Sequence, residues 1–180
     1  MAHIHLEKDV PGIRSLVMYR PDAGKPLYEL AQILLREDSP LSQAERELIA
    51  TFVSSRNDCT FCTSSHAAAA RYLYKDEAQT VDLALDDYQN APISDKLKAL
   101  LTIAGNVQKD ARTVSEENVA LARSFGATDR DIHDTVLIAA SFCMFNRYVD
   151  GLATLTPTDA DTYAVMGERM GTLGYIPPKS

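Results

Sequence analysis

Apolar residues recur every three to four positions along most of the chain, which is the spacing of one face of an α-helix. Leu27, Leu30 and Leu34 form one such set, and Leu97 and Leu100 belong to another. No run of alternating β-branched residues indicates a strand. The pattern therefore predicts an all-α helical bundle. The expected helices cover about 25–36, 43–56, 59–74 and 159–170, and further ones begin after Ser94, Ser115 and Thr128.

Polar residues, glycine and proline mark where these helices begin and end. Ser42 and Glu45 have the spacing of a capping box, in which each side chain satisfies a backbone amide of the other residue. Gly126 is expected to end a helix in the left-handed conformation. Pro21 predicts a break, so we expect residues 1–23 to be irregular.

We expect one all-helical domain over residues 1–180, because a chain of this length can bury a sizeable core. Its core covers about residues 24–155, between an N-terminal arm at 1–23 and a C-terminal helix and tail at 156–180. The segments 97–107 and 132–145 carry apolar residues on more faces than one small bundle can bury. They predict a homo-oligomer.

Composition and charge exclude several functions. Lys and Arg number 18 against 25 Asp and Glu, so the net charge is −7, which disfavours a nucleic-acid partner. No apolar stretch approaches the roughly 20 residues of a membrane span, and the N-terminus does not resemble a signal peptide. The three cysteines are too few for a disulfide-stabilised secreted protein, so we expect a cytoplasmic location.

The residues that indicate chemistry are Cys59, Cys62 and His66. On a helix, this spacing places two thiols and an imidazole within a stripe about 60° wide. Both cysteines fall in the first turn, where free amides and the helix dipole stabilise a thiolate. His66 lies one turn further and can exchange a proton with Cys62. Such a pair can cycle between dithiol and disulfide.

Glu47 is a further candidate, on the helix that precedes the cysteines. It lies nearly opposite the main apolar face of that helix, beside the small residues Ala44, Ala50 and Thr51. A face of small residues allows a second helix to approach closely. If that helix carries the cysteines, Glu47 would lie near His66 or the thiols and could orient the imidazole.

These residues also allow other interpretations. The cysteines could bind zinc or have a purely structural role in a helical binding module, and Cys143 is the remaining thiol that could complete a zinc site. Its apolar surroundings favour a buried, inert cysteine. His3, His5 and His133 have no evident partner. Asn146, Arg147 and Asp150 could equally form a buried polar network or an interface.

The order of these residues resembles the signature of the alkylhydroperoxidase D family, within the carboxymuconolactone decarboxylase superfamily. The matching motif is Glu47 followed by Cys59-x-x-Cys62-x-x-x-His66, after the capped helix 41–49. The segment 145–152, with its Asn-Arg-x-x-Asp-Gly-Leu ending, is similar to the peroxidase-related branch of that family. The resemblance extends from about residue 10 to about residue 170.

This resemblance implies an alkylhydroperoxidase D-like helical bundle, a homo-oligomer, and thiol peroxidase chemistry without a haem or metal cofactor. Cys62 would be the peroxidatic thiol and Cys59 the resolving thiol, and His66 with Glu47 would form the proton relay. The substrate would be hydrogen peroxide or an organic hydroperoxide. The reductant would be an external dithiol of the thioredoxin-like or lipoyl kind.

Two points separate this chain from parts of the family. Some members have a second histidine between the cysteines, where this chain has Phe61. Decarboxylating relatives lack the cysteine pair. A cofactor-free lactone decarboxylase or isomerase, with His66 and Glu47 as acid and base, therefore ranks behind the peroxidase as an alternative.

Overall fold

A computed structural model describes residues 1–7 and 9–175 and contains α-helices but no strand within that part of the chain. The all-α prediction is confirmed. The helices are α1 (Ile13–Tyr19), α2 (Pro21–Leu35), α3 (Gln43–Arg56), α4 (Thr60–Tyr74), α5 (Gln79–Asp87), α6 (Asp95–Asp110), α7 (Glu116–Ser124), α8 (Asp129–Gly151) and α9 (Ala160–Leu173). Short 3₁₀ turns follow α4 and α6, at Lys75–Glu77 and Ala111–Thr113.

The predicted helix starts are confirmed by their caps. The Ser42 hydroxyl accepts a hydrogen bond from the Glu45 amide, and the Glu45 carboxylate accepts one from the Ser42 amide. Thr128 forms a second capping box at the start of α8. Gly126 has φ of 88°, in the left-handed region. These local signals set the helix boundaries because each satisfies backbone groups that the helix leaves free.

The prediction that residues 1–23 are irregular is wrong from Ile13 onward. Residues 13–19 form α1, and Pro21 begins α2 instead of breaking the structure. Proline is accommodated at the first helical position because the amide it lacks would have no partner there. α1 and α2 pack closely where they meet, because a Cβ on Gly24 of α2 would lie only 2.7 Å from the Val17 backbone of α1. This tertiary packing stabilises the connection between the two helices. α1 has no side-chain cap, so no local signal marked it.

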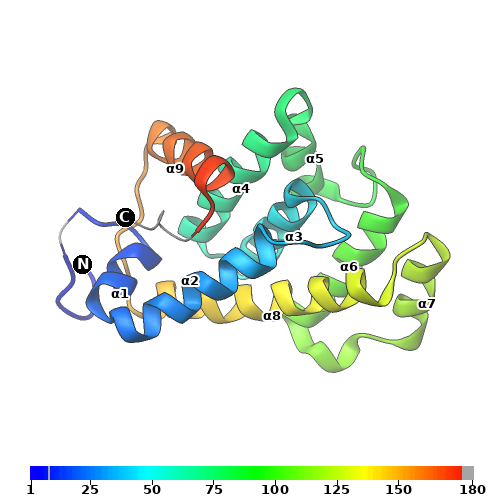
Figure 1. The fold of residues 1–180 in the computed structure, drawn as a ribbon, viewed down its shortest axis with the longest axis horizontal. Coiled ribbons are helices and arrows are strands. Elements are labelled where there is room, and N and C mark those ends of the chain that lie inside the picture. The colour runs from blue at the N-terminus through cyan, green and yellow to red at the C-terminus, as the bar shows by residue number, and fades with distance from the viewer. Residues whose placement is uncertain (8, 176–180) are drawn as a thin grey trace.

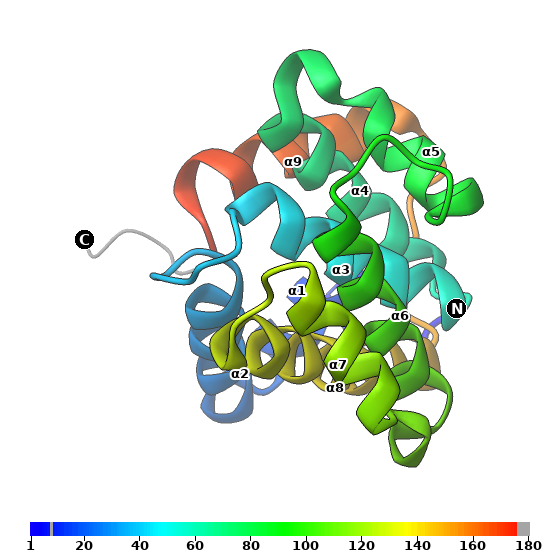
Figure 2. The same cartoon turned by 90° about the vertical axis from the view of Figure 1, so that its right-hand side faces the viewer.

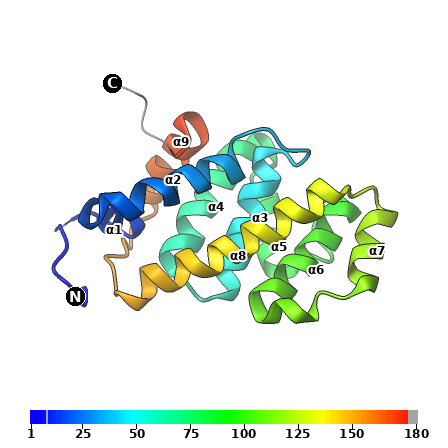
Figure 3. The same ribbon diagram turned by 60° about the horizontal axis from the view of Figure 1, so that its bottom comes forward.

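Helix α3 lies at the centre of the bundle. Every residue from Arg46 to Ser54 is buried, including the polar ones. α4 packs against one side of α3, and α9 covers α4, while the long α8 runs beneath (Figure 1). The view in Figure 3 shows α8 passing across α3 and α4. A central α3 explains why Glu47, which faced away from the apolar stripe, is nevertheless buried.

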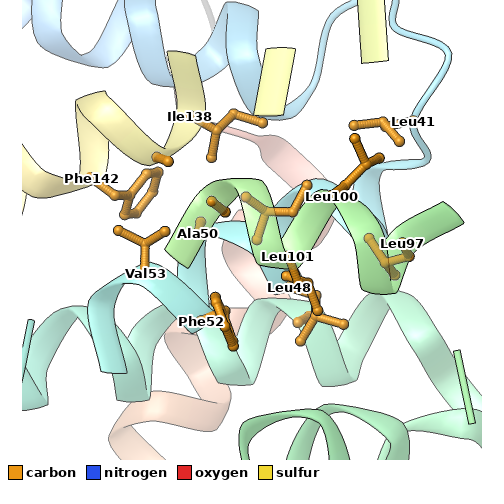
Figure 4. Packing of buried hydrophobic residues seen from close by; sticks show 14 of the residues in the cluster. Leu41, Leu48, Ala50, Phe52, Val53, Leu97, Leu100, Leu101, Ile138 and Phe142 are labelled. Carbon is orange, nitrogen blue, oxygen red and sulfur yellow. The ribbon is translucent and has the colours of Figure 1, made fainter. Parts of the chain in front are cut away.

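The main hydrophobic core joins α3, α6 and α8. Figure 4 shows Phe52 and Val53 of α3 with Leu100 of α6 and with Ile138 and Phe142 of α8. The helices α6 and α7 form the end of the molecule away from α1 (Figure 1), and this end faces the viewer in Figure 2. No helix among the described residues combines the length and the apolar character that crossing a bilayer requires.

Candidate active site

The site begins at the tight connection between α3 and α4. Asp58 has φ of 57°, and the Cys59 amide donates back to the Ser54 carbonyl at 3.1 Å. The side chain of Asn57 donates to Asn146 at 2.8 Å, and Asn146 in turn donates to Ser54 at 3.1 Å. Asn146 therefore belongs to a buried network that fixes this connection to α8.

This connection places the two cysteines in the first turn of α4, as the spacing predicts. Cys59 is the N-cap residue, and Cys62 is the third residue of the helix. Both are buried free thiols, and they share a second hydrophobic cluster with Leu16 and Val149. The interaction with the Cys62 side chain, together with burial, raises the pKa of the Cys59 thiol far above its ordinary value. Cys59 therefore keeps its proton at neutral pH.

The predicted approach of Glu47 to His66 is present in the structure. Glu47 is fully buried, and its Oε2 lies 2.7 Å from His66 Nδ1. Burial by itself would raise the pKa of Glu47, but His66, the Arg36 guanidinium and the Tyr175 hydroxyl outweigh it, and the net pKa lies below the ordinary value. An ionised carboxylate only accepts hydrogen bonds, so Nδ1 of His66 carries the proton that is donated to Glu47.

Two residues that sequence reasoning missed complete the surroundings of Glu47. Its Oε1 accepts from the Tyr175 hydroxyl at 2.5 Å and from Arg36 Nη2 at 2.6 Å. Arg36 follows α2 and also donates to the Met170 carbonyl of α9 at 3.1 Å. Burial and the Glu47 charge raise the pKa of Tyr175 well above its ordinary value, so its hydroxyl remains a donor. No periodic or motif signal in the sequence indicates either residue.

Aromatic rings hold the imidazole of His66 in place. Phe142 of α8 meets it edge-on with ring centroids 4.6 Å apart, and the Tyr175 ring stacks against it at 6.0 Å. The His66 side chain is 13% exposed, so solvent or a small ligand can still reach it. The surroundings fix the ring while leaving part of it open.

The remaining candidates lie apart from this site. Cys143 belongs to the main core and accepts a weak hydrogen bond from Asn57, at 3.6 Å. In residues 1–7 and 9–175, no group of three or more His, Cys, Asp or Glu side chains is placed to bind a metal ion. Cys143 thus does not supply the fourth ligand that the zinc alternative requires. His133 has a partner that sequence reasoning did not find, Asp134 at 3.0 Å.

Asp150 and Arg147 differ from Asn146 in their surroundings. Asp150, in the last turn of α8, is exposed and interacts with the Cys59 thiol, which contributes to raising the pKa of that thiol. Arg147 is exposed and donates to the Cys143 carbonyl at 2.9 Å within the same helix. Of this trio, Asn146 alone lies in the buried network, and Asp150 borders the thiol pair.

A comparison with known protein families covers the segment that carries these residues. A model of the carboxymuconolactone decarboxylase family matches residues 21–85, which include Glu47, both cysteines of the motif and His66. No curated protein sequence matches the chain.

Solved structures extend the similarity to most of the chain. A peroxidase-related protein from Ralstonia eutropha, described as an alkylhydroperoxidase AhpD core, is 28% identical with a TM-score of 0.77, over 88% of this chain and 82% of that one. A peroxidase-related protein from Silicibacter is also 28% identical with a TM-score of 0.77, over 86% and 79%. A putative antioxidant defence protein AhpD from Agrobacterium tumefaciens shares the fold, at 20% identity and a TM-score of 0.68, over 82% and 99%. The chain is thus similar in fold to alkylhydroperoxidase D-like, peroxidase-related proteins, and its residues 21–85 match the carboxymuconolactone decarboxylase family.

Proposed function

We propose that this protein is a thiol-dependent peroxidase that reduces hydrogen peroxide or organic hydroperoxides through a Cys59–Cys62 dithiol/disulfide cycle. The observation that carries the proposal is the buried contact of 2.7 Å between Glu47 and His66, one helical turn after Cys62. It orients the imidazole of His66 on the same helix that carries the thiols in its first turn, and a thiol nucleophile needs such a base and a helix N-terminus near neutral pH.

In the first half of the cycle, His66 Nε2 accepts the Cys62 proton and the thiolate attacks one oxygen of the hydroperoxide. The O–O bond breaks, and its electron pair leaves with the other oxygen. His66 returns the proton to that oxygen, which gives an alcohol or water. Cys62 is then a sulfenic acid. Glu47 stays ionised throughout and stabilises the imidazolium that forms between these two transfers.

In the second half, the Cys59 thiol condenses with the Cys62 sulfenic acid, which forms a disulfide and releases water. One feature supports this division of roles: Cys62, the third residue of α4, lies among the free amides of the first turn, which stabilise a thiolate. An external dithiol, thioredoxin-like or lipoyl, would then reduce the disulfide by exchange and become oxidised itself. The cycle needs a reducing compartment, so a cytoplasmic location is part of the proposal.

A lactone decarboxylase is the second candidate, because the family model spans the Glu47–His66 pair and the pair could act as acid and base without the thiols. This function requires that activity survive the loss of both Cys59 and Cys62. The peroxidase requires the opposite, so cysteine variants separate the two.

The test uses single serine variants of each cysteine, followed by peroxide consumption and by trapping of sulfenic acid with a 1,3-dione. We expect Cys62→Ser to abolish turnover and Cys59→Ser to leave a trappable sulfenic acid on Cys62. Cys143→Ser is the matched control, since this thiol lies outside the proposed cycle, and it should turn over normally. Normal turnover in both the Cys59 and the Cys62 variant would show the scheme to be wrong.

A further inference from the structure

A small pocket lies against His66, one helical turn after Cys62, and neither Cys59 nor Cys62 is among its lining residues. Its volume is about 80 Å³, and His66 and Tyr175 form part of its wall. Phe61, Met166 and Met170 supply apolar surface. A space of this size holds a few water-sized groups, such as a hydroperoxide and the carbon that carries it. We call it the inner pocket.

A larger pocket of about 500 Å³ lies next to it, between α1, α2 and α9. We call it the outer pocket. The two pockets share three lining residues, Arg14 of α1, Tyr28 of α2 and Arg169 of α9. These three side chains therefore stand where a molecule would pass from the outer pocket toward His66.

The boundary between the pockets carries positive charge. Arg14 and Arg169 are exposed, and neither forms an ion pair or a side-chain hydrogen bond within the described part of the chain. The other two charged residues of the outer pocket, Lys25 and Glu29, offset each other at 3.9 Å. Among the described residues, no ion pair offsets the positive charges of Arg14 and Arg169, although the chain as a whole has a net charge of −7.

Tyr28 lines both pockets together with these two arginines. Burial raises the pKa of Tyr28, while the charges of Arg14 and Arg169 act to lower it. Two guanidinium groups and a hydroxyl that line one boundary are donors that suit a carboxylate.

We infer that the preferred substrate is an organic hydroperoxide that carries a carboxylate. Its carboxylate binds Arg14 and Arg169 at the boundary, and its hydroperoxide end enters the inner pocket beside His66. The apolar wall of that pocket contacts the carbon skeleton. This inference rests on the proposed peroxidase function and adds a substrate class to it.

The kinetic test compares two substrates that differ by one charge. One is cumene hydroperoxide with a carboxylate in the para position, and the other is its methyl ester. We expect the ratio of kcat/KM between acid and ester to fall about tenfold in the full-length double variant Arg14→Gln/Arg169→Gln, since each exposed arginine contributes about threefold. Arg123→Gln, an exposed arginine of α7, is the matched control and should keep the wild-type ratio. An unchanged ratio in the double variant would overturn the inference.

A binding test keeps the inference separate from the proposed function. The unreactive alcohol that corresponds to the acid is titrated into the reduced protein and followed by calorimetry. We expect the double variant to bind it about tenfold more weakly than wild type does, even if no hydroperoxide is turned over. In that outcome the anion site stands and the peroxidase proposal fails. Absence of binding to wild type, or equal affinities, would contradict the anion site itself. Thermal unfolding checks that each variant is folded.

Discussion

At the scale of single residues, the site depends on how the two carboxylate oxygens of Glu47 are used. One oxygen binds His66, and the other binds Tyr175 and Arg36. Three donors surround one fully buried carboxylate, so its charge is offset inside the protein. Removing any one donor leaves the buried Glu47 carboxylate with fewer hydrogen bonds. The resulting loss in the free energy of unfolding is greater than for a hydrogen bond on the surface.

Tyr175→Phe tests the second of these contacts. The variant keeps the ring against His66 and removes the hydroxyl that donates to Glu47. Because a hydrogen bond to a buried charge is worth about 2 kcal/mol, we expect that loss in the free energy of unfolding. We also expect about tenfold slower peroxide turnover, since the relay is held less firmly. Urea unfolding and steady-state kinetics measure the two effects.

The control for this variant is Tyr72→Phe. The Tyr72 hydroxyl accepts a hydrogen bond from Thr172 at 3.1 Å on the surface. Its loss should change the free energy of unfolding by about 0.5 kcal/mol or less. Equal effects of the two substitutions would mean that the contact with Glu47 contributes nothing specific.

The charge of Glu47 also predicts how stability depends on pH. The pKa of Glu47 is lowered in the folded protein, so its contribution is fully present above the ordinary carboxyl value of 4.5. That contribution is lost as the pH falls below 4.5 and through the folded-state pKa. We therefore expect Glu47→Gln to lose less stability than wild type between pH 6 and pH 3, a range of about three units chosen to span this transition.

Unfolding by urea at several pH values checks this expectation. Glu168→Gln, an exposed position on α9, is the control and should follow the wild-type profile. A Glu47→Gln profile parallel to wild type over the whole range would contradict a lowered pKa for this carboxyl.

At the scale of elements, the packing of α9 on α4 brings the C-terminal end of α9 to the site. The two helices meet at Gly167, where an added Cβ would lie 2.5 Å from the Ala68 backbone. Beyond α9, Gly174 has φ of 71° and turns the chain so that Tyr175 reaches Glu47. The site is thus built from α3 and α4, and α9 closes it.

Gly167→Ala should therefore weaken both stability and activity. Alanine favours a helix over glycine by about 1 kcal/mol, but overpacking against a backbone costs about 1–3 kcal/mol. The steric cost prevails because backbone atoms cannot move aside, so we expect a net loss of about 1 kcal/mol and slower peroxide turnover. Urea unfolding and kinetics measure these changes.

Gly151→Ala is the matched control. It is the last residue of α8, and a Cβ there would meet no atom within 4 Å. This substitution should leave stability and turnover close to wild type. A similar loss at both positions would mean that the close contact between α9 and α4 is not the cause.

At the scale of the whole molecule, local signals predicted more of the structure than of the site. Caps and apolar spacing predicted the helices, because both act within a few residues. The small face around Glu47 predicted its approach to His66. Arg36 and Tyr175 could not be found in this way, since they lie 11 and 128 residues from Glu47 in sequence and meet it through tertiary packing.

The homo-oligomer remains a prediction. The structure changes the reasons for it, because the apolar residues of α6, such as Leu101 and Ile103, are buried within the chain itself. Leu137 and Met144 of α8 and Ile33 of α2 are exposed apolar side chains. Contact with a second copy of the chain would remove these three apolar side chains from water.

The most direct test of the central claim follows the cysteines of the wild-type protein. The reduced protein receives one equivalent of hydroperoxide, the loss of peroxide is measured, and the peptide that contains Cys59 and Cys62 is analysed by mass spectrometry. We expect one Cys59–Cys62 disulfide for each peroxide consumed, with Cys143 still reduced. Consumption of peroxide with the pair still reduced, or no consumption at all, would contradict the proposed cycle.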